Sequence, residues 1–252
     1  MTSDKQLRLN RIFGPDGKTM VAALDHGIAG LSPLEHLTVP RTLLPEVVRN
    51  GADAIITTPG VARGAGDLFG RAGLILRVDG GPSALTGDWG NMEVLLSAED
   101  ALRLGADAVI MMGITGTPDE ARSLAALGRM AARCAEWGLP LVAEMLPGGF
   151  AAKEVTSEQL QVSARLAAEL GADVVKIRYQ GPPEAFRNVT RACYVPVIVL
   201  GGSRQSPEQL VGEVTQALEA GARGVAIGRN IWQAEQPGKM VAALAEVVHR
   251  HG

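Results

Sequence analysis

The chain has 252 residues, of which 46% are hydrophobic and 20% charged, and its formal net charge is −3. That length is close to the roughly 250 residues of one (β/α)8 barrel and is enough to bury one large core. The near-balanced charge and the lack of a basic run disfavour nucleic-acid binding. No apolar stretch approaches the roughly 18–20 residues of a membrane span, and residues 1–11 lack the apolar core of a signal peptide. We therefore expect a cytoplasmic protein with no nucleic-acid or membrane partner.

Short apolar runs alternate with amphipathic helical patterns along the chain. We expect eight strands at about residues 19–24, 53–57, 74–78, 107–112, 140–144, 173–177, 195–200 and 223–227. Helical patterns are clearest over residues 118–136, 157–170, 206–220 and 237–249. Regular alternation of helix and strand predicts a parallel sheet covered by helices. The long, Gly-rich connection over residues 79–95 is typical of an active-site loop.

A short pattern recurs between the helical and apolar segments. Gly-Ala-Asp occurs at residues 51–53, 105–107 and 171–173, and Gly-Ala-Arg occurs at residues 221–223. The Gly is typical of the left-handed position that ends a helix. The apolar run after each copy is typical of a strand buried on both faces. The repeat therefore predicts recurring units of helix, tight turn and buried strand.

These units predict a single (β/α)8 TIM barrel over residues 1–252. An open, doubly wound sheet would use the same alternation, but no GxGxxG motif follows the first strand and no Walker A motif occurs. The two cysteines, Cys134 and Cys193, have neither a CxxC partner nor a His at metal-ligand spacing. We expect both to be reduced structural thiols, and we expect no metal site.

Glycine-rich segments end the seventh and eighth predicted strands, namely Gly201-Gly202-Ser203 and Gly228-Arg229. In (β/α)8 barrels, the loops after these strands often hold a phosphate together with a short extra helix, which residues 230–233 can form. Glycine lets backbone N–H groups approach phosphate oxygens closely, and Arg229 adds a charge-assisted hydrogen bond. The alternative is that these glycines only form tight turns.

Lys176 ends the sixth predicted strand between apolar neighbours. Catalytic groups of these barrels sit at such strand ends, and burial favours the neutral amine that attacks a carbonyl. Alternatively, the amine reaches solvent or pairs with a carboxylate. Glu144, at the end of the fifth strand, is either a second catalytic carboxylate or that ion-pair partner.

Two further candidates end the first strand. Asp25 can bind a substrate hydroxyl or move a proton. His26 can titrate near neutral pH, or it only orders the loop through a hydrogen bond.

Several of these segments carry a resemblance to a known family. They are residues 23–27, 97–109, 136–140, 173–176, 200–203 and 228–233. Together, and in this order, they make the chain resemble the DeoC/LacD-type class I aldolases. The resembling branch contains archaeal-type fructose-1,6-bisphosphate aldolases and 2-amino-3,7-dideoxy-D-threo-hept-6-ulosonate synthases. The resemblance covers nearly the whole chain.

The resemblance implies a role for each matching residue. Lys176 would form the Schiff base, and Asp25 would contact substrate hydroxyls or assist proton transfer. The phosphate of a ketose phosphate would be held by Gly202, Ser203, Gly228 and Arg229. No metal and no cofactor are implied, because the protonated imine is the electron sink. A homo-oligomer is also implied, and decamers are common in the family.

One segment departs from the family pattern. After the fifth strand the family usually has Tyr-Pro-Arg-Gly, with the Tyr as acid/base residue, whereas this chain has Leu146-Pro147-Gly148-Gly149. Leucine cannot move a proton. Glu144, His26 and Tyr179, which follows Lys176 by three residues, are candidates to replace the Tyr.

The sequence favours a class I aldolase or transaldolase that cleaves or transfers a three-carbon unit of a phosphorylated ketose through an imine on Lys176. The alternative is a sugar-phosphate isomerase, cyclase or acyl-transfer enzyme that works on the same barrel without an imine. A non-catalytic regulator is disfavoured because Asp25 and Lys176 are both present. In each case the expected partner is a phosphorylated small molecule.

Overall fold

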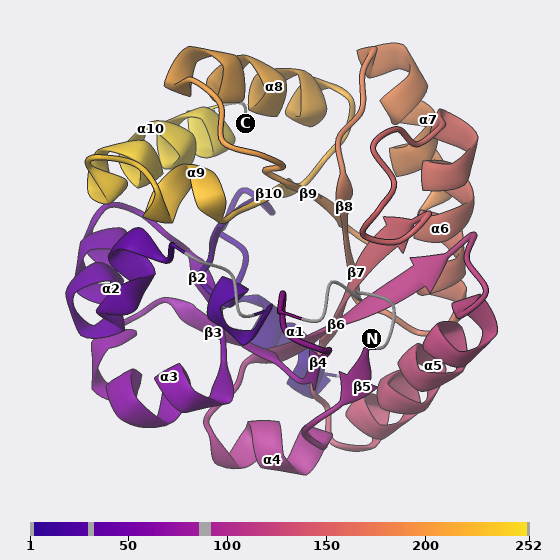
Figure 1. The fold of residues 1–252 in the computed structure, drawn as a ribbon, viewed down its shortest axis with the longest axis horizontal. Helices are drawn as coiled ribbons and strands as arrows, with labels where there is room; N and C mark the ends of the chain where they lie inside the picture. The colour runs from indigo at the N-terminus through magenta and orange to yellow at the C-terminus, as the bar shows by residue number, and fades with distance from the viewer. Residues whose placement is uncertain (1–2, 30–32, 86–91, 251–252) are drawn as a thin grey trace.

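The computed structural model describes residues 3–29, 33–85 and 92–250, and its parallel strands close into a barrel (Figure 1). The barrel strands are β1 (Thr19–Ala23), β2 (Ala54–Thr57), β3 (Gly73–Arg77), β6 (Ala108–Thr115), β7 (Leu141–Pro147), β8 (Val174–Arg178), β9 (Val197–Leu200) and β10 (Gly224–Ile227). Each strand pairs in parallel with the next along the chain, and β10 pairs with β1 to close the barrel. The predicted (β/α)8 fold is confirmed.

Helices surround the strands in Figure 1. The longer ones are α2 (Pro40–Arg49), α5 (Glu120–Glu136), α6 (Ser157–Glu169), α7 (Pro183–Ala192), α8 (Pro207–Glu219) and α10 (Pro237–Arg250). The shorter ones are α1 (Ser3–Leu9), η1 (His26–Ala29), η2 (Glu35–Thr38), α3 (Pro59–Ala65), η3 (Gly66–Leu68), α4 (Ala98–Arg103) and α9 (Arg229–Trp232). Within the described ranges, no helix is both long and apolar enough to cross a membrane.

The predicted active-site loop contains a small antiparallel pair, β4 (Asp79–Gly80) and β5 (Glu93–Val94). Residues 86–91 of that loop lie outside the described part of the chain. Strands β6 and β7 both run about three residues further than the sequence predicts, because their pairing continues from Gly113↔Met145 to Thr115↔Pro147. This extension raises one wall of the barrel at its carboxyl end.

Capping boxes begin three of the helices. Ser97, Thr156 and Ser206 each accept a hydrogen bond from the backbone N–H three residues later, at the starts of α4, α6 and α8. Side chains of this kind satisfy N–H groups that have no partner inside the helix. The caps therefore fix where each helix starts after its strand.

Side chains alternate between the barrel interior and the helix-facing surface, as the period of two in a strand requires. The interior layer is apolar and consists of Val21, Ala23, Ala54, Ile56, Ile75, Ala108, Ile110, Val142, Val174, Ile198 and Ala226. Leu9 and Ile12 belong to the same cluster. The segment around α1 therefore plugs the barrel at the amino ends of the strands.

The Asp of each Gly-Ala-Asp repeat has a structural role at this lower end. Asp53 accepts a hydrogen bond from the backbone N–H of Met20 at 2.7 Å. Asp107 accepts one from Leu74 at 3.0 Å, and Asp173 accepts one from Leu141 at 2.9 Å. Each carboxylate thus ties the start of its own strand to the start of a neighbouring strand.

Basic side chains from both ends of the chain meet these carboxylates. Lys5 contacts Asp173 at 2.7 Å and Arg11 contacts Asp107 at 2.9 Å. His249 of α10 lies 3.0 Å from Asp53 and 2.9 Å from Asp16. The repeat therefore anchors the plug and the last helix to the barrel floor.

Candidate active site

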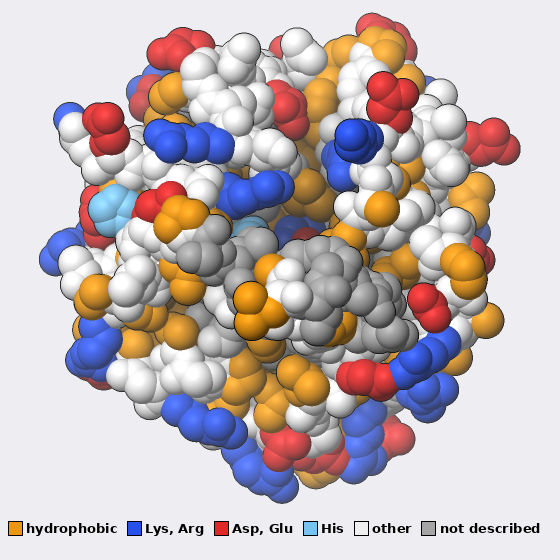
Figure 2. Space-filling view, viewed as in Figure 1, with side chains coloured by type: hydrophobic (Ala, Val, Ile, Leu, Met, Phe, Trp, Pro, Cys, Tyr) orange, Lys and Arg blue, Asp and Glu red, His pale blue; other side chains and the backbone are white. Residues whose placement is uncertain are grey.

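A cavity of about 850 Å³ opens at the carboxyl ends of the strands, within the usual range for ligand sites. Figure 2 shows a hollow near the centre of this face, with Lys and Arg side chains along its upper edge. Most of the residues predicted for the site line the cavity: Asp25, His26, Glu144, Lys176, Gly201, Gly202, Gly228 and Arg229. The structure thus brings together residues from β1, β7, β8, β9 and β10.

Strand alternation aims the charged side chains inward. Lys176 is two residues beyond interior Val174, and Glu144 is two beyond Val142. The same spacing relates Arg77 to Ile75 and Asp25 to Ala23. A charged layer therefore lies directly on the apolar interior layer.

Lys176 and Glu144 form the central contact of this layer. The Lys176 Nζ atom lies 2.6 Å from Glu144 Oε1, and the two side chains are 5% and 10% exposed. The strand register explains the contact, because Glu144 is directly opposite Lys176 in the β7–β8 pair. Glu144 can therefore exchange a proton with the amine of Lys176.

Arg77 holds the carboxylates of the layer in place. Its Nη2 atom donates to the second oxygen of Glu144. Its Nε atom donates to Asp25 at 2.8 Å and its Nη1 atom to Asp79 at 3.1 Å. This role of Arg77 was not predicted from the sequence. The available signal was that Arg77 lies two residues after Ile75, which faces the barrel interior.

The charges shift the proton affinities of both carboxyl groups. Burial alone would raise the pKa of Glu144, but the positive charges of Lys176 and Arg77 outweigh it and lower that pKa. The pKa of Asp25 is also lowered, because Arg77 and Lys176 outweigh the effect of its burial. Both groups are therefore carboxylates before any ligand enters.

His26 lies on the cavity wall at the start of η1. Its Nδ1 atom is 3.7 Å from Asp25, and no hydrogen-bond partner for it occurs among the described residues. Burial lowers the pKa of His26, although Asp25 opposes the shift. A Cβ atom on Gly228 would lie 2.2 Å from the ring, so position 228 must be glycine for the ring to pack here.

Asn230 joins the two Gly-rich loops. Its amide donates to the carbonyls of Gly201 at 2.9 Å and Ser203 at 3.0 Å. Its carbonyl accepts from the backbone N–H of Gln205 at 2.9 Å. Ser203 is exposed and is not among the residues that line the cavity. Sequence reasoning missed Asn230, although a polar residue beside Ile231 and Trp232 was a usable signal.

Tyr179 points away from the cavity. Its hydroxyl donates to Gln216 of α8 at 3.2 Å, and its ring packs edge-on against Phe186 at 5.0 Å between centroids. Alternation explains this placement, because a residue three beyond an inward-facing Lys must face outward. By the same rule Arg178 faces inward, and it lines the cavity.

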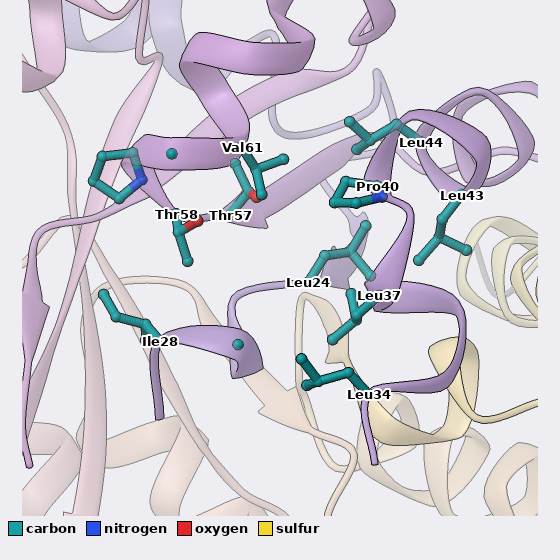
Figure 3. A pocket seen from close by; sticks show the side chains of 13 residues that line it. Leu24, Ile28, Leu34, Leu37, Pro40, Leu43, Leu44, Thr57, Thr58 and Val61 are labelled. Carbon is teal, nitrogen blue, oxygen red and sulfur yellow. The ribbon is translucent and has the colours of Figure 1, made fainter. Parts of the chain in front are cut away.

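A second cavity, of about 390 Å³, lies beside the first and shares Ile28 with it. Figure 3 shows its lining of leucines, prolines and Val61, together with Thr57 and Thr58. None of its lining residues is charged. The charged side chains around Lys176 therefore line the first cavity and not this one.

Comparison with known proteins agrees with this geometry. A model of the DeoC/LacD family aldolases matches residues 19–234. The chain belongs to this family. It is 36% identical to a 2-amino-3,7-dideoxy-D-threo-hept-6-ulosonate synthase of Halobacterium salinarum, over 97% of this chain and 91% of the relative. The corresponding synthase 1 of Archaeoglobus fulgidus is 34% identical, with the same shares covered.

A solved structure extends the comparison to the chemistry. It is an archaeal fructose-1,6-bisphosphate aldolase with its catalytic Lys covalently bound to the carbinolamine intermediate of the substrate. The TM-score is 0.86 at 32% identity, covering 97% of this chain and 99% of that one. The sequence-based prediction of a class I, Schiff-base aldolase or transaldolase is confirmed.

Proposed function

We propose that Lys176 forms the Schiff base with a phosphorylated ketose and that Glu144 moves the protons of the reaction. The observation that carries this proposal is the 2.6 Å contact between the Lys176 amine and Glu144 inside the cavity. The relatives support the substrate class, because they include an aldolase of a sugar bisphosphate and 2-amino-3,7-dideoxy-D-threo-hept-6-ulosonate synthases.

The pair supplies what imine formation needs. Glu144 takes a proton from the Lys176 ammonium, and the amine attacks the ketone to form a carbinolamine. The same carboxyl returns the proton to the hydroxyl group, which leaves as water. The resulting iminium accepts the electron pair of the breaking C–C bond, while a carboxylate removes the proton of the neighbouring hydroxyl.

Arg77 and Asp25 position the reacting groups. Arg77 fixes one oxygen of Glu144 and leaves the other on Lys176. Asp25 has one oxygen on Arg77, and its second oxygen can accept a substrate hydroxyl. Glu144 thereby takes over the proton transfer that Leu146 cannot perform.

The substrate phosphate would bind at the other end of the cavity. Gly201, Gly202 and Gly228 line that end beside Arg229. Their backbone can approach a phosphate closely, and the guanidinium of Arg229 adds charge. Ser203, on the same loop as Gly202, can contribute a hydroxyl after a small movement.

Borohydride trapping tests the central claim. The protein is incubated with dihydroxyacetone phosphate and reduced, and the adduct is located by mass spectrometry. We expect one adduct, on Lys176, and none in Lys176→Met. No adduct despite measurable binding would favour the imine-free isomerase, cyclase or acyl-transfer alternative, with Lys176 as a charged partner of Glu144.

Glu144→Gln tests the proton-transfer role. The amide keeps the size of the side chain but cannot accept a proton, so turnover falls about 10²–10⁴-fold. Trapping on Lys176 slows but still occurs. The pH dependence of turnover on the acid side also disappears, which a merely structural loss would not cause.

We further propose a homo-oligomer in a reducing compartment such as the cytoplasm. Cys134 and Cys193 are buried free thiols, which supports reducing conditions. Light scattering of the purified protein tests the oligomer, for which a monomeric mass would be the contrary result.

A further inference from the structure

We propose that Arg178 is a further phosphate-binding residue, so that the substrate phosphate is held between Arg178 on one side and Arg229 on the other. This inference rests on the proposed function, because it concerns the phosphate of the same ketose. It adds a cation from β8 to the Gly-rich loops that follow β9 and β10. It also defines the ligand class as a phosphate monoester with two negative charges.

Arg178 faces the cavity from the last position of β8. It lies two residues after Lys176 on the same strand, and both side chains line the cavity. In the β8–β9 pair, Arg178 is opposite Leu200, which directly precedes Gly201 and Gly202. Arg178 therefore lies at the edge of the loop to which we assign phosphate binding.

The strand order brings the two arginines to opposite sides of that loop. Strands β8, β9 and β10 are neighbours in the barrel (Figure 1). Arg178 ends β8 and Arg229 follows β10, so the loop after β9 comes between them. Burial lowers the pKa of Arg229, and the nearby charge of Arg178 lowers it further. A phosphate on the loop would thus be close to both guanidinium groups.

Both arginines lack an acidic partner. Within residues 3–29, 33–85 and 92–250, no Asp or Glu forms an ion pair with Arg178 or Arg229, and this includes Asp119 on the cavity wall. The carboxylates of the charged layer pair with Arg77 and Lys176 instead. Both unpaired arginines are half-buried, and a cation partly removed from water is stabilised by an anion. Two such cations side by side favour a ligand with two negative charges.

Backbone contacts hold the Arg178 side chain in place. Its Nη1 atom donates to the carbonyls of Lys153 at 3.1 Å and Ala152 at 3.4 Å. These carbonyls belong to the loop between β7 and α6. In the described part of the chain, the Nε and Nη2 atoms of Arg178 have no hydrogen-bond partner. The loop therefore fixes the guanidinium through one nitrogen and leaves two nitrogens for phosphate oxygens, which reduces the entropy lost on binding.

A phosphate monoester matches this arrangement better than a carboxylate. It carries about 1.5 to 2 negative charges at pH 7, and its three free oxygens are strong acceptors. Some oxygens can accept from the Gly-rich loops while others accept from the two guanidinium groups. A carboxylate has one charge and two oxygens, so it would leave one arginine unpaired. We therefore expect the site to select phosphorylated ligands over carboxylated ones.

Binding of sn-glycerol 3-phosphate tests the inference without imine formation, because this probe has no carbonyl group. Its Kd is measured by isothermal titration calorimetry, with glycerate as the carboxylate comparison. We expect the parent to bind the phosphate at least about tenfold more tightly than glycerate, and Arg178→Met to weaken phosphate binding about ten- to hundredfold. No measurable binding by the parent, or an unchanged Kd in Arg178→Met, would overturn the inference.

Arg187→Met is the matched control for this measurement. Arg187 also donates to a backbone carbonyl, that of Glu219, but it is not among the residues that line the cavity. Its Kd should equal that of the parent. Arg178→Lys keeps the charge but not the planar group, so its Kd should lie between those of the parent and Arg178→Met. This variant also serves if Arg178→Met does not fold.

Borohydride trapping with two donors separates phosphate binding from a merely structural role. We measure the concentration that gives half-maximal trapping on Lys176 for dihydroxyacetone phosphate and for dihydroxyacetone. Arg178→Met should raise this concentration at least about tenfold for the phosphorylated donor and less than about twofold for the other. If Arg178 only ordered the loop, both donors would be affected equally, which would overturn the inference.

The two proposals fail in distinguishable ways. Absence of any adduct, together with phosphate binding that is lost in Arg178→Met, would overturn the imine chemistry and leave this inference standing. An adduct on Lys176, together with phosphate binding that Arg178→Met leaves unchanged, would overturn this inference alone.

Discussion

The carboxylates at the lower end of the barrel are held differently from the two nearest Lys176 at its upper end. At the lower end, Asp53, Asp107 and Asp173 each accept a backbone N–H from a neighbouring strand. At the upper end, the contacts of Asp25 and Glu144 described above are with side chains, chiefly those of Arg77 and Lys176. A carboxylate fixed to backbone cannot move without breaking the sheet edge, whereas one held by side chains can exchange protons and partners.

Acidic side chains therefore serve stability at the amino ends of the parallel strands and chemistry at their carboxyl ends. This is the general division of (β/α)8 barrels. Substitutions at each end can therefore test whether activity and stability depend on different carboxylates.

Lys176→Met should have the largest effect. Removal of the amine abolishes the imine, so we expect turnover to fall at least about a thousandfold. The fold should persist, because Glu144 keeps its contact with Arg77. Steady-state kinetics and circular dichroism measure both properties. Lys239→Met, an exposed residue of α10, is the control, and a fully active Lys176→Met would contradict the assignment.

Arg77→Met should be the most destabilising change at the upper end. It leaves Asp25, Asp79 and Glu144 buried without their shared cation, which costs about 3–5 kcal/mol. We expect the Tm to fall by roughly 10 °C. Arg41→Met, at an exposed ion pair with Asp67, should change the free energy of unfolding by less than about 0.5 kcal/mol.

The same substitution has a pH signature. The pKa values of Asp25 and Glu144 are lowered in the folded protein, so their stabilisation is present above the unfolded values near 4 and is lost as the pH falls. As the pH falls below 5, the free energy of unfolding should therefore decrease more for wild type than for Arg77→Met, by about 1 kcal/mol or more. Parallel curves for the two proteins would contradict this account.

Asp107→Ala tests the lower end. The buried N–H of Leu74 loses its acceptor, which costs about 1–3 kcal/mol. The lost pair with Arg11 adds little, because that Arg side chain is 67% exposed. We expect a lower urea midpoint with kcat/KM unchanged, and a matching loss of activity would contradict the division between the two ends. Asp67→Ala is the exposed control.

His249→Gln should have the smallest effect. Its two carboxylate partners, Asp16 and Asp53, outweigh partial burial and raise the pKa of His249. The pairing is therefore fully present below the unfolded pKa near 6.5 and is lost as the pH rises through the folded value. The stability advantage of wild type, about 0.2–1 kcal/mol, should shrink between pH 6 and 9 in thermal melts. An advantage that grows with pH would contradict the pairing.

The fold was predictable because each unit repeats the same local signals. The glycine that ends a helix and the apolar run after it locate β2, β6 and β8 to within about three residues. The contact between Lys176 and Glu144 was also predictable in outline, because the two residues end adjacent strands. The sequence left open whether Glu144 contacts Lys176. The register of the β7–β8 pair decides this, because it places the two residues opposite each other.

Other features were not predictable in practice. The role of Arg77 depends on three carboxylates from separate parts of the chain meeting at one level of the barrel. Tyr179 was placed among the acid/base candidates by its distance from Lys176 along the sequence. Strict inward and outward alternation would have directed attention to Arg178 instead. The positions of Ile114 and Leu146 depend on how far β6 and β7 extend, which the weak signals at the strand ends do not specify.

The plug around α1 has a consequence for synthesis. Lys5 contacts Asp173, a residue 168 positions later in the chain. During translation, Lys5 therefore cannot form its contact with Asp173 until the segment that contains β8 has been synthesised. Long-range contacts of this kind form slowly, so we expect the N-terminal segment to remain protease-sensitive on ribosome-bound chains until β8 has emerged. The N-terminal residues are synthesised first, but they cover the amino end of the barrel only late in folding.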